Sequence, residues 1–109
     1  MALRLQEVVS VVHCRQADLE FWIAESWVRP VKDDSGYLFA ETDIARIHLI
    51  RDLVEDMAVE QDTVPMVLSL IDQVHGAHRR MARLVSAIDA LPEPQRGELL
   101  RRAGLGDSQ

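Results

Sequence analysis

The segment from Leu19 to Asp43 constrains the fold most strongly, because it holds both tryptophans, both phenylalanines and the only tyrosine of the chain. Aromatic side chains bury large apolar areas, so this segment is expected to supply the centre of a small core. The chain has 109 residues, of which 48% are hydrophobic, and this length suits one globular domain with an appended element. The other elements should pack around this segment.

The first part of the segment is spaced as a helix and the second part as a β-hairpin. One helical face carries Leu19, Trp22, Ile23 and Trp27, so we expect a helix over residues 17–27. Pro30 lacks an amide donor and favours an extended conformation in the residue before it, so the helix must end by Val28. Residues 33–36 then predict a tight turn with a glycine at positive φ, and residues 37–39 predict the returning strand.

The residues before this segment predict a short strand and a short helix. Residues 2–5 allow an edge strand, whereas residues 6–13 suit either a strand or a helix. We favour a helix, because one face is then entirely apolar; that face carries Leu5, Val8, Val9 and Val12. With a corner at residues 15–16, the two helices form a helix-turn-helix, and the hairpin forms a wing beside it.

A third helix is predicted to begin at Ala40 or Thr42 and to end near Ala58. Glu41 and Asp43 lie near its positive end, where carboxylates are favourable. Apolar residues recur every three or four positions and predict one buried face. This face contains Ile44, Ile47, Leu49, Ile50, Leu53, Val54 and Met57. The charged residues are expected to face water or a partner; they include Arg46, Arg51, Asp52, Glu55 and Asp56.

The longest regular pattern predicts a fourth helix, capped by Asp62 and ended by Pro92. Its apolar seam follows steps of three and four at Val64, Val67, Ile71, Val74, His78, Met81, Val85 and Ile88. About four heptads of this kind predict a coiled coil, and pairing with a second copy of the chain gives a homodimer. His78 is expected to fix the register. The alternative is that the helix folds back onto its own domain.

These patterns predict three regions. Residues 1–59 form a winged helix-turn-helix domain, residues 60–91 form the dimerisation helix, and residues 92–109 form a short helix (95–103) and a tail. Acidic residues concentrate in the first region. It contains six Lys/Arg against eleven Asp/Glu, whereas residues 60–109 contain six against seven. Because affinity for duplex DNA comes largely from neutralised phosphates, this charge disfavours DNA as the ligand of the wing region.

The sequence contains no recognisable catalytic, cofactor or metal site. The glycines form no phosphate-binding loop, and the adjacent His13 and Cys14 would point in different directions on a helix. His75 and His78 are spaced for a shared metal, but further ligands are missing. We therefore expect no enzyme activity, no cofactor and no metal. The lone cysteine and the absence of a signal peptide or membrane-length apolar run indicate a cytoplasmic protein.

Three motifs resemble the winged-helix fold of MerR-type regulators. They are W-V-R-P at residues 27–30, D-S-G-Y-L-F at residues 34–39 and D-I-A-R-I-x-L-I-R-D-L at residues 43–53. The resemblance implies a mostly α-helical protein with a small β wing and a long C-terminal dimerisation helix. Two positions depart from the family pattern, because Glu20 and Leu38 stand where the family has arginines that contact the DNA backbone. A carboxylate at the first position would repel phosphate.

These departures resemble one branch, the CbpM-type chaperone modulators, which are MerR-like proteins that bind and inhibit the J-domain of a DnaJ/CbpA-like co-chaperone. The motifs L-x-F-W-I-x-x-x-W-V-x-P at residues 19–30 and V-L-x-L-I-D-Q at residues 67–73 carry this resemblance. It implies a homodimeric, non-enzymatic modulator that occludes the basic surface of the J-domain, with no membrane partner. The alternative is a MerR-like DNA-binding transcription regulator.

The two hypotheses use different residues. For the J-domain, the candidate contacts are acidic residues with Phe21 or Trp22 as an apolar anchor. The full set is Asp18, Glu20, Phe21, Trp22, Glu25, Asp33, Asp34, Glu41 and Asp43. For DNA, the basic contacts would be Arg15, Arg29, Lys32, Arg46 and Arg51.

Overall fold

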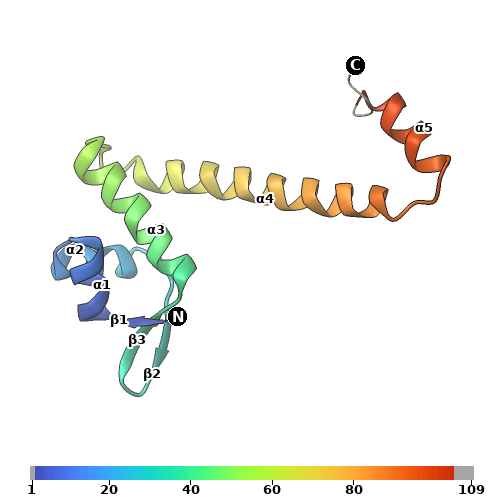
Figure 1. The fold of residues 1–109 in the computed structure, drawn as a ribbon. Coiled ribbons are helices and arrows are strands. Elements are labelled where there is room, and N and C mark those ends of the chain that lie inside the picture. The colour runs from blue at the N-terminus through green and yellow to red at the C-terminus, as the bar shows by residue number, and fades with distance from the viewer. Residues whose placement is uncertain (1, 105–109) are drawn as a thin grey trace. The chain divides into compact units, whose positions relative to one another are not determined.

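The computed structural model describes residues 2–104, and internal contacts divide the chain into two units, Met1–Ser69 and Leu70–Gln109. The first unit contains β1 (Leu3–Arg4), α1 (Leu5–Val12), α2 (Gln16–Ala24), β2 (Val31–Asp33), β3 (Gly36–Phe39), α3 (Glu41–Arg51) and the π-helical turn η1 (Asp52–Asp56) (Figure 1). Helix α4 (Val64–Asp89) begins in the first unit and continues in the second, which also contains α5 (Gln95–Arg102). The predicted fold class, mostly helical with a small β wing and a long helix after it, is confirmed.

Helix α1 confirms the helix that we favoured for the ambiguous valine-rich stretch. Val8 and Val12 are buried on its inner face, and Leu5 and Val9 are partly buried beside them. The helix ends at His13, whose left-handed backbone (φ 63°) turns the chain toward α2. Together, α1 and α2 form the predicted helix-turn-helix.

Helix α2 ends at Ala24, earlier than the predicted end at Trp27. Ser26 adopts a left-handed conformation (φ 63°), and the amide of Trp27 donates a hydrogen bond to the carbonyl oxygen of Trp22 at 2.9 Å. This turn ends the helix before the proline and folds Trp27 back into the core. The prediction that the helix stops by Val28 is therefore confirmed, although the helix is shorter than expected.

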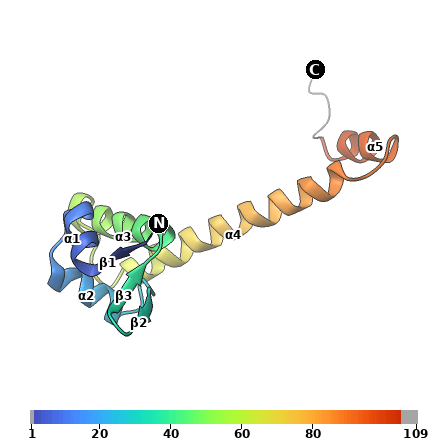
Figure 2. The ribbon, with the colours of Figure 1, turned by 60° about the horizontal axis from the view of Figure 1, so that its bottom comes forward.

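The strands form one antiparallel sheet in the order β1–β3–β2 (Figure 2). Leu3 lies opposite Phe39 in one pair, and Asp33 lies opposite Gly36 at the end of the hairpin. The hairpin turns at residues 34–35, and Gly36 adopts a φ of 114°, which L residues rarely adopt. The predicted wing and the predicted edge strand are both confirmed.

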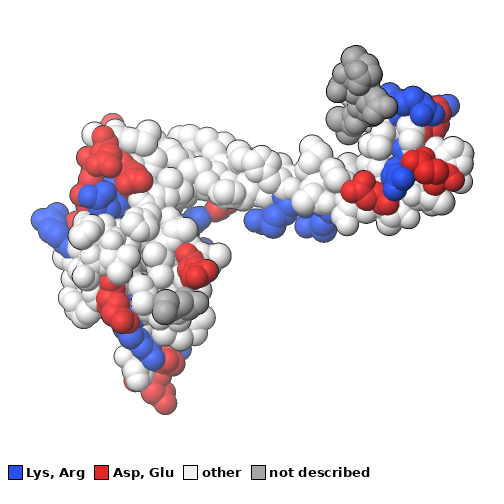
Figure 3. All heavy atoms as spheres, viewed as in Figure 1, with Lys and Arg blue, Asp and Glu red and all other residues white. Residues whose placement is uncertain are grey.

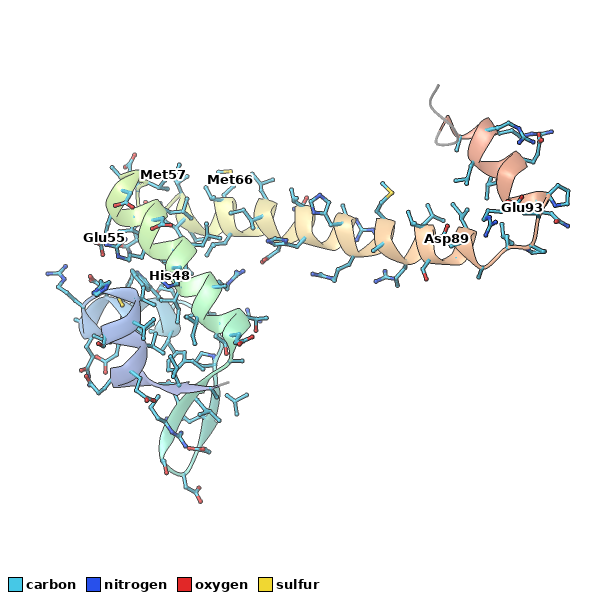
Figure 4. The ribbon with its side chains drawn as sticks, viewed as in Figure 1. His48, Glu55, Met57, Met66, Asp89 and Glu93 are labelled. Carbon is cyan, nitrogen blue, oxygen red and sulfur yellow. The ribbon has the colours of Figure 1, made fainter. Side chains whose placement is uncertain are left out.

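Helix α3 and η1 together confirm a helical segment that ends near Ala58, but its last turn is wider than expected. The amide of Met57 bonds the carbonyl oxygen of Asp52 at 2.9 Å, which is the i to i−5 pattern of a π-helix. The additional residue in this turn rotates Met57 away from the core, so its side chain is 65% exposed (Figure 4). The prediction that Met57 lies on the buried face is wrong, whereas Ile47 and Ile50 are fully buried as expected.

One hydrophobic core unites the elements of the first unit. Its largest fully buried side chains include Phe39 from β3 and Leu19 from α2. Val64 and Leu68, in the first two turns of α4, belong to the same core. The first unit therefore extends beyond residue 59, and Val64 is not available to the predicted seam.

The second unit consists of the rest of α4 and of α5. Helix α5 confirms the short helix predicted after the prolines, and it carries ion pairs between Arg96 and Glu93 at 2.9 Å and between Arg101 and Glu98 at 2.6 Å. The predicted tail lies beyond residue 104, outside the described residues. Within residues 2–104, no helix has both the length and the apolar composition that a membrane span requires.

Candidate protein-binding surface of the first unit

Helix α2 presents carboxylates outward because its apolar residues face the core. Glu20 and Glu25 are exposed, and Asp18 is half-buried. The side-chain amide of Gln6 donates a hydrogen bond to Gln16 Oε1 at 2.6 Å, and Gln16 Nε2 donates to Glu20 Oε2 at 3.2 Å. This chain of hydrogen bonds holds the Glu20 carboxylate at the surface.

The aromatic residues of this region divide between core and surface. Trp22 is only 3% exposed, so it is a core residue and does not serve as the predicted anchor. Phe21 is 36% exposed, and its ring packs edge-to-face against Trp27 with 5.7 Å between centroids and an interplanar angle of 81°. Of the two candidate anchors, only Phe21 is accessible to a partner.

At the hairpin, one predicted carboxylate is engaged and its neighbour is not. Arg4 binds Asp33 through both terminal guanidinium nitrogens, at 2.9 and 3.0 Å, and the amide of Ser35 donates to Asp33 Oδ1 at 2.9 Å. The hydrogen bond from Arg4, helped by the Ser35 amide, lowers the pKa of Asp33. Asp34 is exposed and has no such partner among the described residues. Asp33 therefore joins the sheet to its turn, and Asp34 is the accessible charge.

The carboxylates at the start of α3 also differ in role. Asp43 accepts a hydrogen bond from the backbone amide of Ala40 at 2.9 Å, so it caps the helix, while Glu41 is exposed. The predicted acidic contacts thus lie on three elements of the first unit. Figure 3 shows acidic groups at the hairpin tip, with basic atoms beside them, and a further acidic patch at the end of α3.

Most cations of the first unit are engaged within it. Arg46 Nε donates to the carbonyl oxygen of Trp27, and Arg51 Nε donates to that of His13 at 3.2 Å. Arg51 also lies 3.4–3.9 Å from carboxylates of Asp52, Glu55 and Asp56. The expectation that both arginines face water or a partner is wrong. The two tight turns leave backbone carbonyls that need donors, and these arginines supply them.

Three exposed cations of the first unit are accessible to external contacts, namely Arg15, Arg29 and Lys32. Arg4 binds Asp33, and Arg15 lies 3.1 Å from Asp18. Arg29 is exposed and has no carboxylate partner in the part of the chain that the structure describes. Lys32 lies over the Tyr37 ring, 5.2 Å from its centroid. Overall, the first unit has six Lys/Arg against thirteen Asp/Glu.

A hollow of about 120 Å³ lies between the end of α2 and the segment that leaves α3. Its apolar wall consists of Phe21, Trp22, Trp27, Val54 and Val59. Asp18 and Gln61 are its polar residues. Sequence reasoning missed this hollow, because nothing in the local pattern of residues 18–27 relates them to residues 54–61.

The described residues offer little for catalysis or metal binding. Cys14 is a buried free thiol, as expected, and burial raises its pKa, so it lacks the character of an activated nucleophile. Its neighbour His13 is exposed and belongs to the turn. Within residues 2–104, no group of three or more His, Cys, Asp or Glu side chains is arranged to hold a metal ion.

These features define a winged helix-turn-helix protein with an acidic first unit. Residues 3–64 match the family described as MerR HTH family regulatory protein. This match covers more than half of the 109 residues, so the chain belongs to the MerR family of helix-turn-helix regulatory proteins. Comparisons with curated proteins and with solved structures gave no match.

Proposed function

We propose that this MerR-family protein is a non-enzymatic chaperone modulator, which binds the J-domain of a DnaJ/CbpA-like co-chaperone and inhibits it by covering its basic surface. The observation that carries the proposal is the charge of the first unit. Its carboxylates outnumber its cations by thirteen to six, and four of the six cations are held by groups of the same unit. Such a surface repels phosphate and attracts a basic protein.

The resemblance of residues 19–30 and 67–73 to CbpM-type modulators supports the same partner. In this proposal, Glu20, Glu25 and Asp34 are the main accessible charges, and Phe21 supplies apolar contact area beside them. Charges of this kind accelerate encounter and orient the partner more than they add affinity. Because the Debye length is about 8 Å at physiological ionic strength, the interaction should be sensitive to salt.

The proposal also includes a homodimer formed through α4, in the cytoplasm. Several apolar seam residues of α4 are exposed in the single chain, namely Val74, Met81 and Val85, and His78 lies exposed among them. A second copy would cover these side chains by two-fold pairing. The single cysteine is buried and reduced, which suits a reducing compartment.

Binding measurements test the proposed partner directly. The purified chain should bind the isolated J-domain of a DnaJ/CbpA-like co-chaperone in calorimetry at low salt, and the affinity should fall as salt is raised. The same preparation should not retard duplex DNA in a gel shift. Absence of J-domain binding at low salt, or sequence-dependent retardation of DNA, would overturn the proposal.

Reversing the charge of single carboxylates tests whether this acidic surface binds the J-domain. Glu20→Lys and Asp34→Lys should each weaken J-domain binding about tenfold, because each replaces attraction by repulsion close to the partner. The control is Asp89→Lys in the second unit, which changes the net charge equally and should leave affinity within about twofold. All three variants should keep the thermal melting temperature of the original chain. Equal losses in all three would show that only net charge matters.

A MerR-like DNA-binding transcription regulator is the second candidate, and family membership favours it. Its accessible contacts would be Arg15 together with Arg29 and Lys32, which lie before and within the hairpin. If the protein works in this way, the double variant Arg29→Ala with Lys32→Ala should abolish a sequence-dependent gel shift. The same variant should leave J-domain binding unchanged if the chaperone proposal is right.

A further inference from the structure

The hollow beside α2 has an apolar wall with Asp18 and Gln61 at its polar side, and the first unit leaves it unfilled. Phe21 remains 36% exposed even though it packs against Trp27, and Val54 and Val59 are only partly buried. The left-handed residue Ala58 (φ 52°) turns the chain directly after η1 and brings Val59 to the hollow. Apolar cavities of about 150 Å³ accept a small aromatic molecule, so a hollow of about 120 Å³ suits one aliphatic side chain.

The charges around the hollow restrict its occupant. Asp18 is itself a lining residue. Glu55 directly follows Val54, and Glu60 and Asp62 flank Gln61; all three of these carboxylates are exposed. Arg15 and Arg51 are the cations of this neighbourhood, and both already bind carboxylates. An apolar side chain that belongs to a basic segment therefore complements the site, whereas an acidic segment or a phosphate would be repelled.

We propose that this hollow is the docking site for one leucine or methionine side chain on a basic amphipathic helix of the partner. A lysine or arginine one turn away on that helix would pair with Glu60, because Asp18 already binds Arg15 and because residues three or four apart share a helical face. The inference rests on the proposed function only in naming the J-domain as the source of this helix. It adds a binding site for an apolar side chain of the partner next to Phe21, which lines the hollow.

The chain contains a built-in reporter for this site. Both of its tryptophans, Trp22 and Trp27, line the hollow. Both rings are already nearly buried, so an aliphatic side chain that enters should shift their intrinsic emission through direct contact and not by excluding water. The experiment therefore follows tryptophan emission of the full chain during titration with ligands that contain no tryptophan.

Three ligands separate the inference from the proposed function. They are a tryptophan-free J-domain, a basic helical peptide with a single central leucine, and the same peptide with serine in place of leucine. We expect saturable emission shifts with the J-domain and the leucine peptide, and at least tenfold weaker binding of the serine peptide, because the buried side chain is lost. The two peptides are compared on the unaltered chain, so this result does not depend on the folding of any variant.

A variant that fills the hollow tests the site, and the same substitution elsewhere serves as its control. Val59→Phe places a larger side chain in the hollow and should weaken the leucine peptide about tenfold. The control Val31→Phe makes the same change on β2, where the side chain is 67% exposed, and should leave binding unaltered. Circular dichroism checks that both variants fold.

The outcomes distinguish the two proposals. If the J-domain binds with no emission shift, and Val59→Phe binds it equally well, the hollow is not the anchor site while the proposed function stands. If the leucine peptide binds with the expected shift and the J-domain does not bind, the hollow is an anchor site and the proposed function is wrong. If neither peptide binds, or if the emission shifts with protein concentration alone because a second copy fills the hollow, the inference is overturned.

Discussion

The two units of the chain use similar apolar residues in opposite ways. Within the described residues, every buried hydrophobic side chain lies in the first unit except Ile88. The second unit instead exposes a series of large apolar side chains along α4 and after it, namely Leu70, Val74, Met81, Leu84, Val85, Leu91 and Leu99. The same residue types therefore form a core in the first unit and lie mainly at the surface in the second.

This contrast shows that apolar spacing predicts a face but not what covers it. The first unit combines α1, α2, α3, η1 and the start of α4 with a sheet, so its apolar faces meet each other around Phe39 and Ile47. The second unit has one long and one short helix, which offer too few elements to cover so long a stripe. In the first unit, Arg46 and Arg51 bind backbone carbonyls. In the second unit, Arg96 binds the carbonyl oxygen of Asp89 at 3.3 Å, whereas Arg83 on α4 has no carboxylate partner within residues 2–104.

The largest expected effect comes from removing a core side chain of the first unit. Phe39 is fully buried in β3, so Phe39→Ala should lower the free energy of unfolding by about 3–5 kcal/mol. The control Val31→Ala, on the neighbouring strand β2, removes an exposed side chain and should change it by less than about 0.5 kcal/mol. Urea unfolding followed by tryptophan fluorescence measures both. Similar effects for the two variants would contradict the assigned core.

The next effect concerns the exposed seam of the second unit. Met81 is 58% exposed in the single chain, and the proposed dimer would bury it. Met81→Asp places a charge at this position and should raise the dimer dissociation constant about 100-fold. The control Ala87→Asp adds the same charge off the seam and should change the constant less than about threefold. Sedimentation equilibrium gives both constants. Equal effects, or a monomeric original chain, would refute the seam.

A smaller effect should distinguish Arg46 of the first unit from Arg83 of the second. Arg46→Met removes the donor to the carbonyl oxygen of Trp27, and should lower the free energy of unfolding by about 1.5–3 kcal/mol because a partly buried, charged hydrogen bond is lost. Arg83→Met on α4 should change it by less than about 0.5 kcal/mol. Thermal and urea unfolding provide the values. A neutral Arg46→Met would show that this contact is dispensable.

The smallest expected effect is a change in how the free energy of unfolding depends on pH. Burial raises the pKa of Cys14 above its ordinary value of 9.0, and the carboxylates of Asp18 and Glu55 raise it further. Since the folded state favours the neutral thiol, the buried thiol contributes to the free energy of unfolding. This stabilisation is complete below about pH 9 and is lost as the pH rises through the folded-state pKa. Cys14→Val removes the group, so the decline in stability above about pH 9 should become shallower. Unfolding measured on both sides of that pH tests this, and identical declines would contradict it.

Local patterns in the sequence predicted most of the first unit. The valine face of α1, the stop before Pro30 and the glycine at φ 114° are set by neighbouring residues, and each is confirmed. The acidic character of the first unit follows from composition alone. Local reasoning was wrong at Met57, because the spacing does not reveal the additional residue in η1.

The sequence by itself determined the helix-turn-helix, the wing and the heptad pattern of α4, because these depend on spacing and on residues adjacent in the chain. Only the tertiary structure decided that Trp22 is core while Phe21 is accessible, that Arg46 and Arg51 bind carbonyls at distant turns, and that a hollow opens beside α2. These features require contacts between residues far apart in the chain, and such contacts form only when the elements pack against one another.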